Sequence, residues 1–314
     1  MFLYNRVNKK ELRNKITAEP FKRLTLSFYR YVHIAEPHAL RDELYAYWQS
    51  LKVLGRIYIA HEGINAQLSV PEHFAMDFIN HLCRNSLFKD VPIKQAVEDD
   101  NKSFFALTIK VKRKIVADGL KENAFDTSNT GERLDAFSFH NMSDKPGTVL
   151  VDMRNRYESE VGHFKNAICP DVKTFRESLP KVLKQLEIEK DKNVLLYCTG
   201  GIRCEKASAY LKHHGFNHVY QLDGGIIQYA REMERLGMES KFIGKNFVFD
   251  ERMGERITED VLGKCYQCGE PSDRQVNCAY QPHHVLIIQC EKCAEEMEGC
   301  CSEKCKSQFD NLVI

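Results

Sequence analysis

The sequence lacks a long hydrophobic run and has no excess of charge of either sign. No stretch approaches the ~18 apolar residues that a membrane-spanning helix needs, and Met1 to Arg6 contain no apolar core of a signal peptide. Lys and Arg total 45 against 44 Asp and Glu, so any basic surface for an anionic partner must be local. We therefore expect a cytoplasmic protein with no membrane partner.

The sequence also has no flavin, haem, iron or nucleotide-binding motif. It does contain 12 cysteines, and eight of them lie between Cys265 and Cys305. In a reducing compartment, cysteines are read as thiols, metal ligands or catalysts before disulfides. Their uneven distribution therefore separates a Cys-rich tail from a few isolated cysteines.

The tail contains two Cys-x2-Cys pairs, which is the ligand pattern of a structural zinc site. The predicted ligands are Cys265, Cys268, Cys290 and Cys293. A second site can be drawn from Cys278, His283, His284, Cys300, Cys301 and Cys305, and the set we favour is Cys278, His284, Cys301 and Cys305. A set of packed thiols is the alternative, but so short a tail has little core to hold it without a metal.

Cys198 ends an apolar run and begins a turn that leads into the predicted helix 205–213. At such a turn, backbone N–H groups, the helix N-terminus and the Arg203 guanidinium can all face the sulfur. These groups lower the pKa of a thiol and favour a nucleophilic thiolate over a merely buried cysteine. The candidate catalytic residues are Cys198 and Arg203, and the loop also comprises Thr199, Gly200, Gly201, Ile202 and Cys204.

The first third of the chain alternates between strand and helix patterns. Strands are predicted at 23–32, 55–60, 66–70 and 104–111, and helices at 37–51 and 71–83. The order βαββαβ predicts a ferredoxin-like α+β domain. That fold hosts many functions, so it does not identify one.

A second domain follows a polar stretch that contains one predicted helical segment. Strands are predicted at 148–152, within 161–170, and at 194–197 and 216–222, with helices at 171–186, 205–213 and 226–236. Alternating strands and helices predict a parallel α/β sheet with its site at the strands' carboxyl ends. The expected domain plan is 1–120 (ferredoxin-like domain with an N-terminal arm), 121–144 (linker), 145–240 (parallel domain) and 241–314 (Cys-rich segment).

Four ordered pieces of the second domain resemble the rhodanese family. They are Asp152-Met153-Arg154 with Glu158, Gly162-His163-Phe164, Cys198-x-x-Gly201-x-Arg203 and Leu222-Asp223-Gly224-Gly225. The resemblance implies a rhodanese-like domain in which Cys198 carries a persulfide or acts as a nucleophile. The expected supporting residues are Asp152, Arg154, His163 and Asp223.

The chain as a whole resembles the tRNA uridine(34) hydroxylase family, including Ala60-His61-Glu62-Gly63-Ile64-Asn65-Ala66, the Cys198 loop and the Cys-rich end. The resemblance implies oxygen-dependent conversion of the wobble uridine to 5-hydroxyuridine, with dioxygen as co-substrate and the anticodon region of tRNA as partner. A sulfurtransferase with a Cys198 persulfide and a non-enzymatic tRNA-binding adaptor are the alternatives.

Thiolate chemistry supplies a route to hydroxylation. A thiolate that adds to C6 of uracil makes C5 electron-rich and open to an oxidant. Cys204 can then resolve an oxidised Cys198 as a disulfide, or it can simply pack at the start of the helix.

Basic residues at one strand end are candidates for phosphate contacts. The full set of tRNA-binding candidates is His61, Asn65, Lys110, Lys112, Arg113, Lys114, Arg252 and Arg256, with Lys94 and Lys102 near the cluster in sequence. Such a cluster is usually a solvated sheet edge, and in an enzyme that acts on nucleic acid it is a phosphate-binding face. We expect 252–256 to form an exposed loop, and 61–65 to form a structural turn or part of the site.

Overall fold

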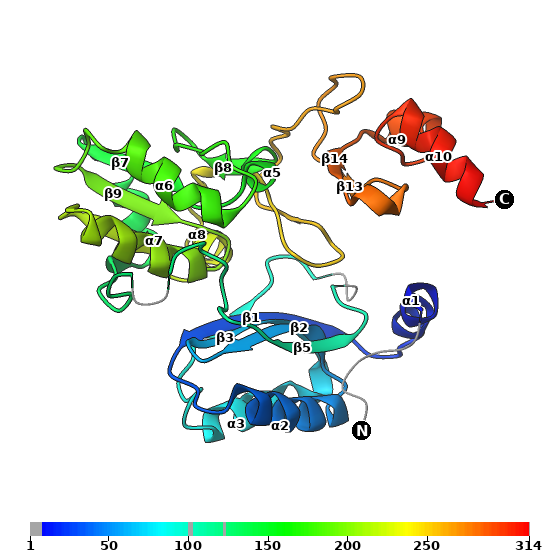
Figure 1. The fold of residues 1–314 in the computed structure, drawn as a ribbon, viewed down its shortest axis with the longest axis horizontal. Coiled ribbons are helices and arrows are strands. Elements are labelled where there is room, and N and C mark those ends of the chain that lie inside the picture. The colour runs from blue at the N-terminus through cyan, green and yellow to red at the C-terminus, as the bar shows by residue number, and fades with distance from the viewer. Residues whose placement is uncertain (1–7, 100–102, 122–123, 314) are drawn as a thin grey trace.

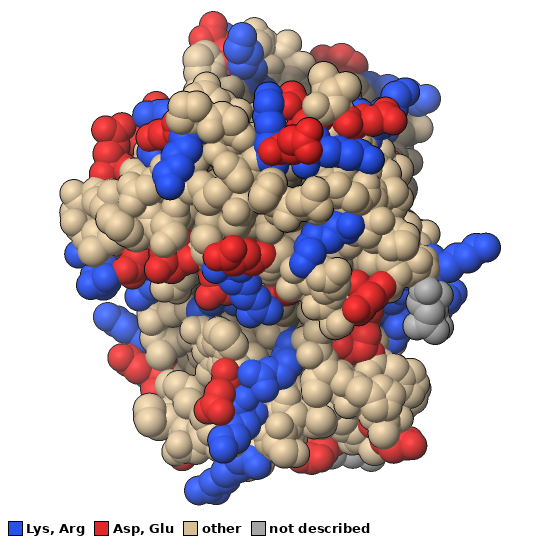
Figure 2. All heavy atoms as spheres, turned by 90° about the vertical axis from the view of Figure 1, so that its left-hand side faces the viewer, with Lys and Arg blue, Asp and Glu red and all other residues tan. Residues whose placement is uncertain are grey.

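The computed structural model describes residues 8–99, 103–121 and 124–313, so Lys102 lies outside the described residues. Figure 1 shows a ferredoxin-like sheet with two helices on one side, a parallel α/β domain, and a Cys-rich tail. This combination of α+β and α/β domains confirms the predicted fold class. Figure 2 shows acidic and basic side chains sharing one face, in keeping with the balanced total of 45 and 44.

The N-terminal domain is built on a five-stranded sheet with the order β4-β1-β3-β2-β5. The strands are β1 (Arg23–Tyr31), β2 (Leu54–Ala60), β3 (Gly63–Pro71), β4 (Lys94–Gln95) and β5 (Leu107–Val111). The helices are α1 (Lys9–Thr17), α2 (Pro37–Ser50) and α3 (Ala75–Arg84), with the 3-10 turn η1 (Glu72–Phe74) before α3. Strand β3 pairs antiparallel with both β1 and β2, and β5 runs parallel to β2.

The last strand of the predicted βαββαβ unit lies elsewhere than expected. It is β4, which pairs with β1 through Leu26 and Ser27, and the predicted strand 104–111 is instead β5 on the opposite edge. Two residues are too few to show an alternating pattern, so β4 leaves no periodic signal in the sequence. Strand β4 carries Lys94 to the domain boundary.

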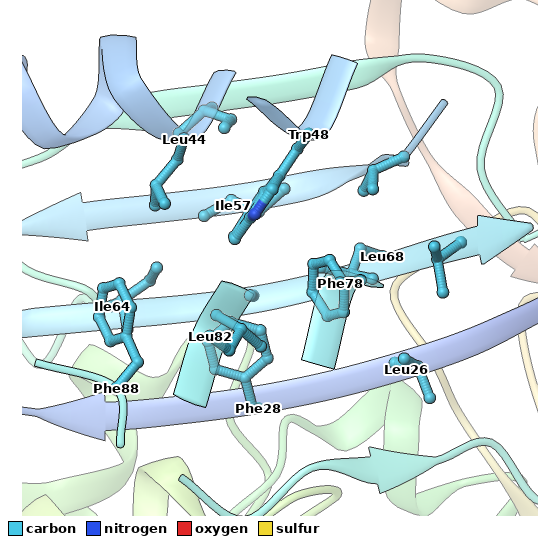
Figure 3. Packing of buried hydrophobic residues seen from close by; sticks show 14 of the residues in the cluster. Leu26, Phe28, Leu44, Trp48, Ile57, Ile64, Leu68, Phe78, Leu82 and Phe88 are labelled. Carbon is cyan, nitrogen blue, oxygen red and sulfur yellow. The ribbon is translucent and has the colours of Figure 1, made fainter. Parts of the chain in front are cut away.

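One face of this sheet forms the core with α2 and α3. Figure 3 shows Phe28 and Leu68 from the sheet packing toward Trp48 and Phe78 from the two helices, and all four side chains are buried. Since side chains alternate along a strand, Tyr29 points to the opposite face. That face is turned toward the rest of the molecule.

The central domain has a parallel four-stranded sheet with the order β6-β10-β9-β7. The strands are β6 (Glu132–Leu134), β7 (Thr148–Asp152), β9 (Asn193–Tyr197) and β10 (Val219–Leu222). The helices are α4 (Ala136–Met142), α5 (Arg156–Ser159), α6 (Phe175–Gln185), α7 (Ile202–His213) and α8 (Gly225–Leu236). The two strands β7 and β9 contain continuous apolar runs, which are typical of parallel strands that are buried on both faces.

The segment expected to be a linker, 121–144, contributes to this domain. Strand β6 pairs with β10, and Phe139 of α4 is fully buried in the central core. Strand β6 is short, and Glu132 and Arg133 in it are exposed. A strand with so few apolar residues is difficult to distinguish from a polar linker in sequence.

The tail extends the central domain through antiparallel pairing. Strand β11 (Phe242–Asn246) joins β8 (Gly162–Phe164) to β12 (Glu255–Arg256). The remaining elements are β13 (Gln275–Asn277), η2 (Gln281–His283), β14 (Leu286–Ile288), α9 (Glu291–Glu296) and α10 (Glu303–Val313). No helix among the described residues has the length and apolar character required to cross a bilayer.

Candidate active site

Cys198 lies between β9 and α7, and its side chain is buried. The Gly201 N–H donates a hydrogen bond to its Sγ at 3.1 Å. Gly201 has a left-handed φ of 98°, and a Cβ there would lie 2.9 Å from the Tyr29 hydroxyl. Helix α8 also stabilises the loop, because the Ile226 N–H donates to the Cys198 carbonyl oxygen at 3.0 Å.

The surroundings of Cys198 favour its thiolate. Burial by itself raises the pKa of this thiol, but a hydrogen bond from Cys204, the Arg203 charge and backbone N–H groups lower it to about 5. Burial and the hydrogen bond to Cys198 raise the pKa of Cys204 well above its ordinary value. At neutral pH, therefore, Cys204 is a thiol that donates to the Cys198 thiolate.

Arg203 is fixed by a buried bidentate ion pair with Glu158. The two guanidinium nitrogens lie 2.6 and 2.8 Å from the Glu158 carboxylate oxygens, and Thr199 Oγ1 lies 3.3 Å from Nη2. Glu158 also accepts the Asn155 N–H at 2.9 Å. Since paired buried charges keep their geometry, the Arg203 charge is held beside the loop.

The four expected supporting residues occupy different places. Asp152 and Arg154 form a fully buried ion pair at 2.7 Å, and Arg154 also donates to the Gly162 carbonyl at 2.5 Å. His163 Nδ1 lies 2.9 Å from the Ser159 carbonyl oxygen. Asp223 is exposed, at the edge of a cavity beside Arg133. The first three therefore stabilise the loops, and only Asp223 faces open space.

A cavity of about 580 Å³ opens beside the Cys198 loop, and we call it the main cavity. Its walls come from all three parts of the chain and include Cys198, Thr199, Arg203, Tyr29, Tyr58, Asn65, Phe249 and Arg252. A second space of about 500 Å³, the polar cavity, is lined by Arg133, Glu205, Lys206 and Asp223 among others. Tyr29 and Lys94 line both cavities.

Ion pairs and hydrogen bonds join the N-terminal domain to α7. Lys206 lies 2.8 Å from both Glu62 and Asp118, and the Tyr29 hydroxyl donates to Glu205 at 2.9 Å. Glu62 also accepts the Ile115 N–H at 2.7 Å. The turn at 61–65 therefore has a role beyond connecting two strands, because Glu62 forms an ion pair between the N-terminal and central domains.

The remaining polar candidates in this turn have separate positions. His61 Nδ1 lies 2.9 Å from the Ile34 carbonyl oxygen, within the N-terminal domain. Asn65 lies in the wall of the main cavity. Of the two, only Asn65 is placed to face a molecule bound beside Cys198.

The basic candidates at the end of β5 differ in their exposure. Lys110, Lys112 and Arg113 are exposed, and Lys114 pairs with Asp118 at 2.7 Å. Figure 2 shows a line of Lys and Arg side chains across its lower half, where the N-terminal domain lies. A surface of this kind is available to an anionic partner.

The expectation that 252–256 is an exposed loop is wrong. The Arg252 side chain is only 7% exposed and pairs with Asp250 at 2.6 Å and Glu255 at 2.7 Å. Arg256 pairs with Asp273. Acids two and three residues away neutralise Arg252, whereas the partner of Arg256 lies 17 residues further along the chain and is brought to it by the fold.

Two clusters in the tail could each hold a metal ion. The first is Cys265, Cys268, Cys290 and Cys293, and the second is Cys278, His283, Cys301 and Cys305, with ligand atoms in each cluster within 4.8 Å of one another. The choice of His284 is wrong, because it is His283 whose Nε2 lies 3.2 Å from Cys305 Sγ. The 3-10 turn η2 ends at His283, and spacing alone does not distinguish adjacent histidines.

Family models match three consecutive parts of the chain. They are the UPF0176 acylphosphatase like domain over residues 23–115, the Rhodanese-like domain over 135–232 and the Rhodanase C-terminal over 243–306. Among solved structures, the rhodanese-like domain of the Anabaena sp. Alr3790 protein is 21% identical, with a TM-score of 0.28, and the match covers 36% of this chain and 78% of that one.

Curated relatives match almost the whole chain. A tRNA uridine(34) hydroxylase of Leptospira interrogans serogroup Icterohaemorrhagiae serovar Lai (strain 56601) is 53% identical over 97% of this chain and 83% of its own length. One of Escherichia coli O157:H7 is 51% identical over 96% of this chain and 87% of its own length. The chain belongs to the tRNA uridine(34) hydroxylase family.

In this member of the tRNA uridine(34) hydroxylase family, the sequence located the loop but not all of its partners. Glu158 stands six residues after Asp152, within the rhodanese-like pattern, and that pattern was the available signal. The sequence did not reveal what Glu62, Lys94 and Lys206 contact, because their partners or the cavities they line come from distant segments. These residues are visible only once the domains are assembled.

The Cys198 thiolate can be tested in this family member by its ultraviolet absorbance. The pH-dependent difference between the parent and Cys198→Ser should show a midpoint near pH 5, because protonation below that pH removes the thiolate. In a Cys204→Ala background the midpoint should rise, since the hydrogen bond to the sulfur is removed. The control variant Cys83→Ala, at an exposed cysteine, should leave the midpoint unchanged. A parent midpoint at the ordinary thiol value would contradict the assignment.

Proposed function

We propose that this chain hydroxylates uridine 34 of tRNA, using dioxygen as co-substrate and giving 5-hydroxyuridine. The observation that carries the proposal is the 53% identity over 97% of the chain to a relative named tRNA uridine(34) hydroxylase. The chemistry of the site agrees, because an activated Cys198 borders a cavity of about 580 Å³. A space of this size accommodates a nucleotide.

Cys198 is the proposed covalent catalyst. Its thiolate adds to C6 of the uracil ring and makes C5 electron-rich toward the oxidant. Arg203 and the loop N–H groups favour the thiolate before the attack. The wobble base lies in the single-stranded anticodon loop, so it can enter the cavity without the disruption of a duplex.

A second candidate function is sulfur transfer through a Cys198 persulfide. It is supported by the match of residues 135–232 to the Rhodanese-like domain. The loop N–H groups that face Sγ are equally suited to an anionic persulfide. Both functions need Cys198, so the product must distinguish them.

We also propose that each tail cluster holds a structural zinc ion. Four cysteines, or three cysteines with one histidine, are ligand sets of structural zinc, and four protein ligands leave no open position for catalysis. The two ions would stabilise a segment that also supplies Phe249 and Arg252 to the wall of the main cavity. Removal of the metal would therefore affect the site through its wall.

Nucleoside analysis tests the proposed reaction. In a bacterial strain without wobble-uridine hydroxylation, the parent chain should restore 5-hydroxyuridine in tRNA, as detected by mass spectrometry, and Cys198→Ala should not. The surface change Cys83→Ala serves as the control. Restoration of a thiolated nucleoside in place of 5-hydroxyuridine would favour the sulfurtransferase. Full activity of Cys198→Ala would rule out both.

Metal analysis of purified protein tests the two zinc sites. The parent should contain two zinc ions per chain, and His283→Ala should contain about one, because the three cysteines that remain at the second site bind zinc less tightly than four ligands do. His284→Ala is the matched control and should retain both. Equal metal contents in the two histidine variants would contradict the second ligand set.

Charge reversal tests the basic surface as a binding face for tRNA. Lys112→Glu with Arg113→Glu should weaken binding to tRNA and flatten its salt dependence, by about one in log–log slope for each phosphate that the protein no longer neutralises. Lys184→Glu with Lys190→Glu changes the net charge equally at exposed positions of the central domain. This control should retain the parent slope. Equal slopes for both double variants would locate the tRNA-binding face elsewhere.

A further inference from the structure

Lys94 is a buried cation at the boundary between the domains. It lies on β4, its residue surface is only 7% exposed, and its Nζ stands 4.8 Å from the centre of the Tyr29 ring. Among the residues that the structure describes, its ammonium has no hydrogen bond and no ion pair. Burying a charge without a partner is costly, so this arrangement favours a site that an electron-rich ligand completes.

Lys94 lies in the same cavity as Cys198. Both residues line the main cavity, and Lys94 also lines the polar cavity. Across the boundary lies the turn before α8, where a Cβ on Gly224 would come within 3.5 Å of Lys94 Cε. Burial lowers the pKa of Lys94, and the negative charges of Asp223 and Cys198 oppose that effect. The ammonium and the thiolate are therefore close enough to influence each other.

We propose that Lys94 is a catalytic residue whose ammonium stabilises the negative charge that forms on the uracil ring when Cys198 adds to it. This inference rests on the proposed function and adds a residue from the N-terminal domain to the reaction. Tyr29 positions the ammonium through the face of its ring.

The step is a nucleophilic addition in which the negative charge moves from the sulfur to the uracil ring. An electron pair of Cys198 Sγ forms the S–C6 bond, and the C5=C6 π pair moves toward C5 and O4 to give an enolate. No proton or electron leaves the pair, and the single negative charge is conserved. An N–H of Lys94 donates to O4, where the charge appears, so the interaction is stronger after addition than before it.

A phosphate is the other anion that a lysine can bind. Exposed cations suit a tRNA backbone, and Lys112 and Arg113 on this domain are exposed. Lys94 is instead enclosed between Tyr29 and the turn at Gly224, in the same cavity as the Cys198 loop. This enclosure favours contact with the base over contact with the backbone.

The addition step can be followed without the oxidation. An anticodon stem-loop RNA with 5-fluorouridine at the wobble position should form a covalent adduct with Cys198 of the full-length chain, detected by mass spectrometry. Lys94→Met should lower the adduct rate by about 10²-fold with the RNA dissociation constant unchanged. Lys94→Arg should recover part of the rate, and the exposed neighbour Lys89, changed to Met, should keep all of it.

Several other results of these experiments would contradict the role of Lys94. A parent-like adduct rate in Lys94→Met would remove Lys94 from the reaction, and an RNA affinity that falls as far as the rate would make it a phosphate ligand. Thermal unfolding of Lys94→Met below that of the parent, with no recovery in Lys94→Arg, would make its role structural. A parent that restores 5-hydroxyuridine in cells but forms no adduct would overturn this inference alone. A parent that does neither would overturn the proposed function as well.

Discussion

The buried ammonium of Lys206 sets the geometry on which the rest of the molecule depends. Its residue surface is 2% exposed, and it lies 2.8 Å from carboxylates of Glu62 and Asp118. A buried charge that loses one partner is strongly destabilising, so the two domains cannot separate without exposing or isolating it. Because Lys206 lies on α7, directly after the Cys198 loop, this constraint holds the N-terminal sheet over the site.

In this geometry the central domain and the other two parts of the chain make different contributions to the site. The central domain activates the sulfur, since Gly201, Arg203 and Cys204 belong to one turn and its helix, and Glu158 fixes the arginine. The N-terminal sheet and the tail supply further walls of the main cavity. The Cys198 thiolate of the central domain therefore borders a space that all three parts of the chain line, which suits a substrate far larger than a small sulfur acceptor.

The tail, residues 241–314, packs against the central domain and contributes to the main cavity. Strand β11 pairs with β8, and Gln275 donates to the Tyr157 carbonyl at 2.6 Å. Phe249 and Arg252 then reach the main cavity. The two cysteine clusters lie further along the same segment, so the proposed zinc ligands and the wall of the site belong to one continuous structure.

The sequence by itself determined the features that short segments encode. Alternation and helical spacing predict most elements of both domains, the turn after Cys198 predicts an activated thiol, and the Cys-x2-Cys pairs predict a set of metal ligands. Only the tertiary structure decided the position of β4, the choice of His283 over His284, the pairing of Arg256 with Asp273 and the shared cavity of Lys94 and the Cys198 loop. The physical reason is distance along the chain. Backbone periodicity and turn chemistry act over a few residues, but an ion pair or a cavity wall depends on which distant segments the folded domains bring together.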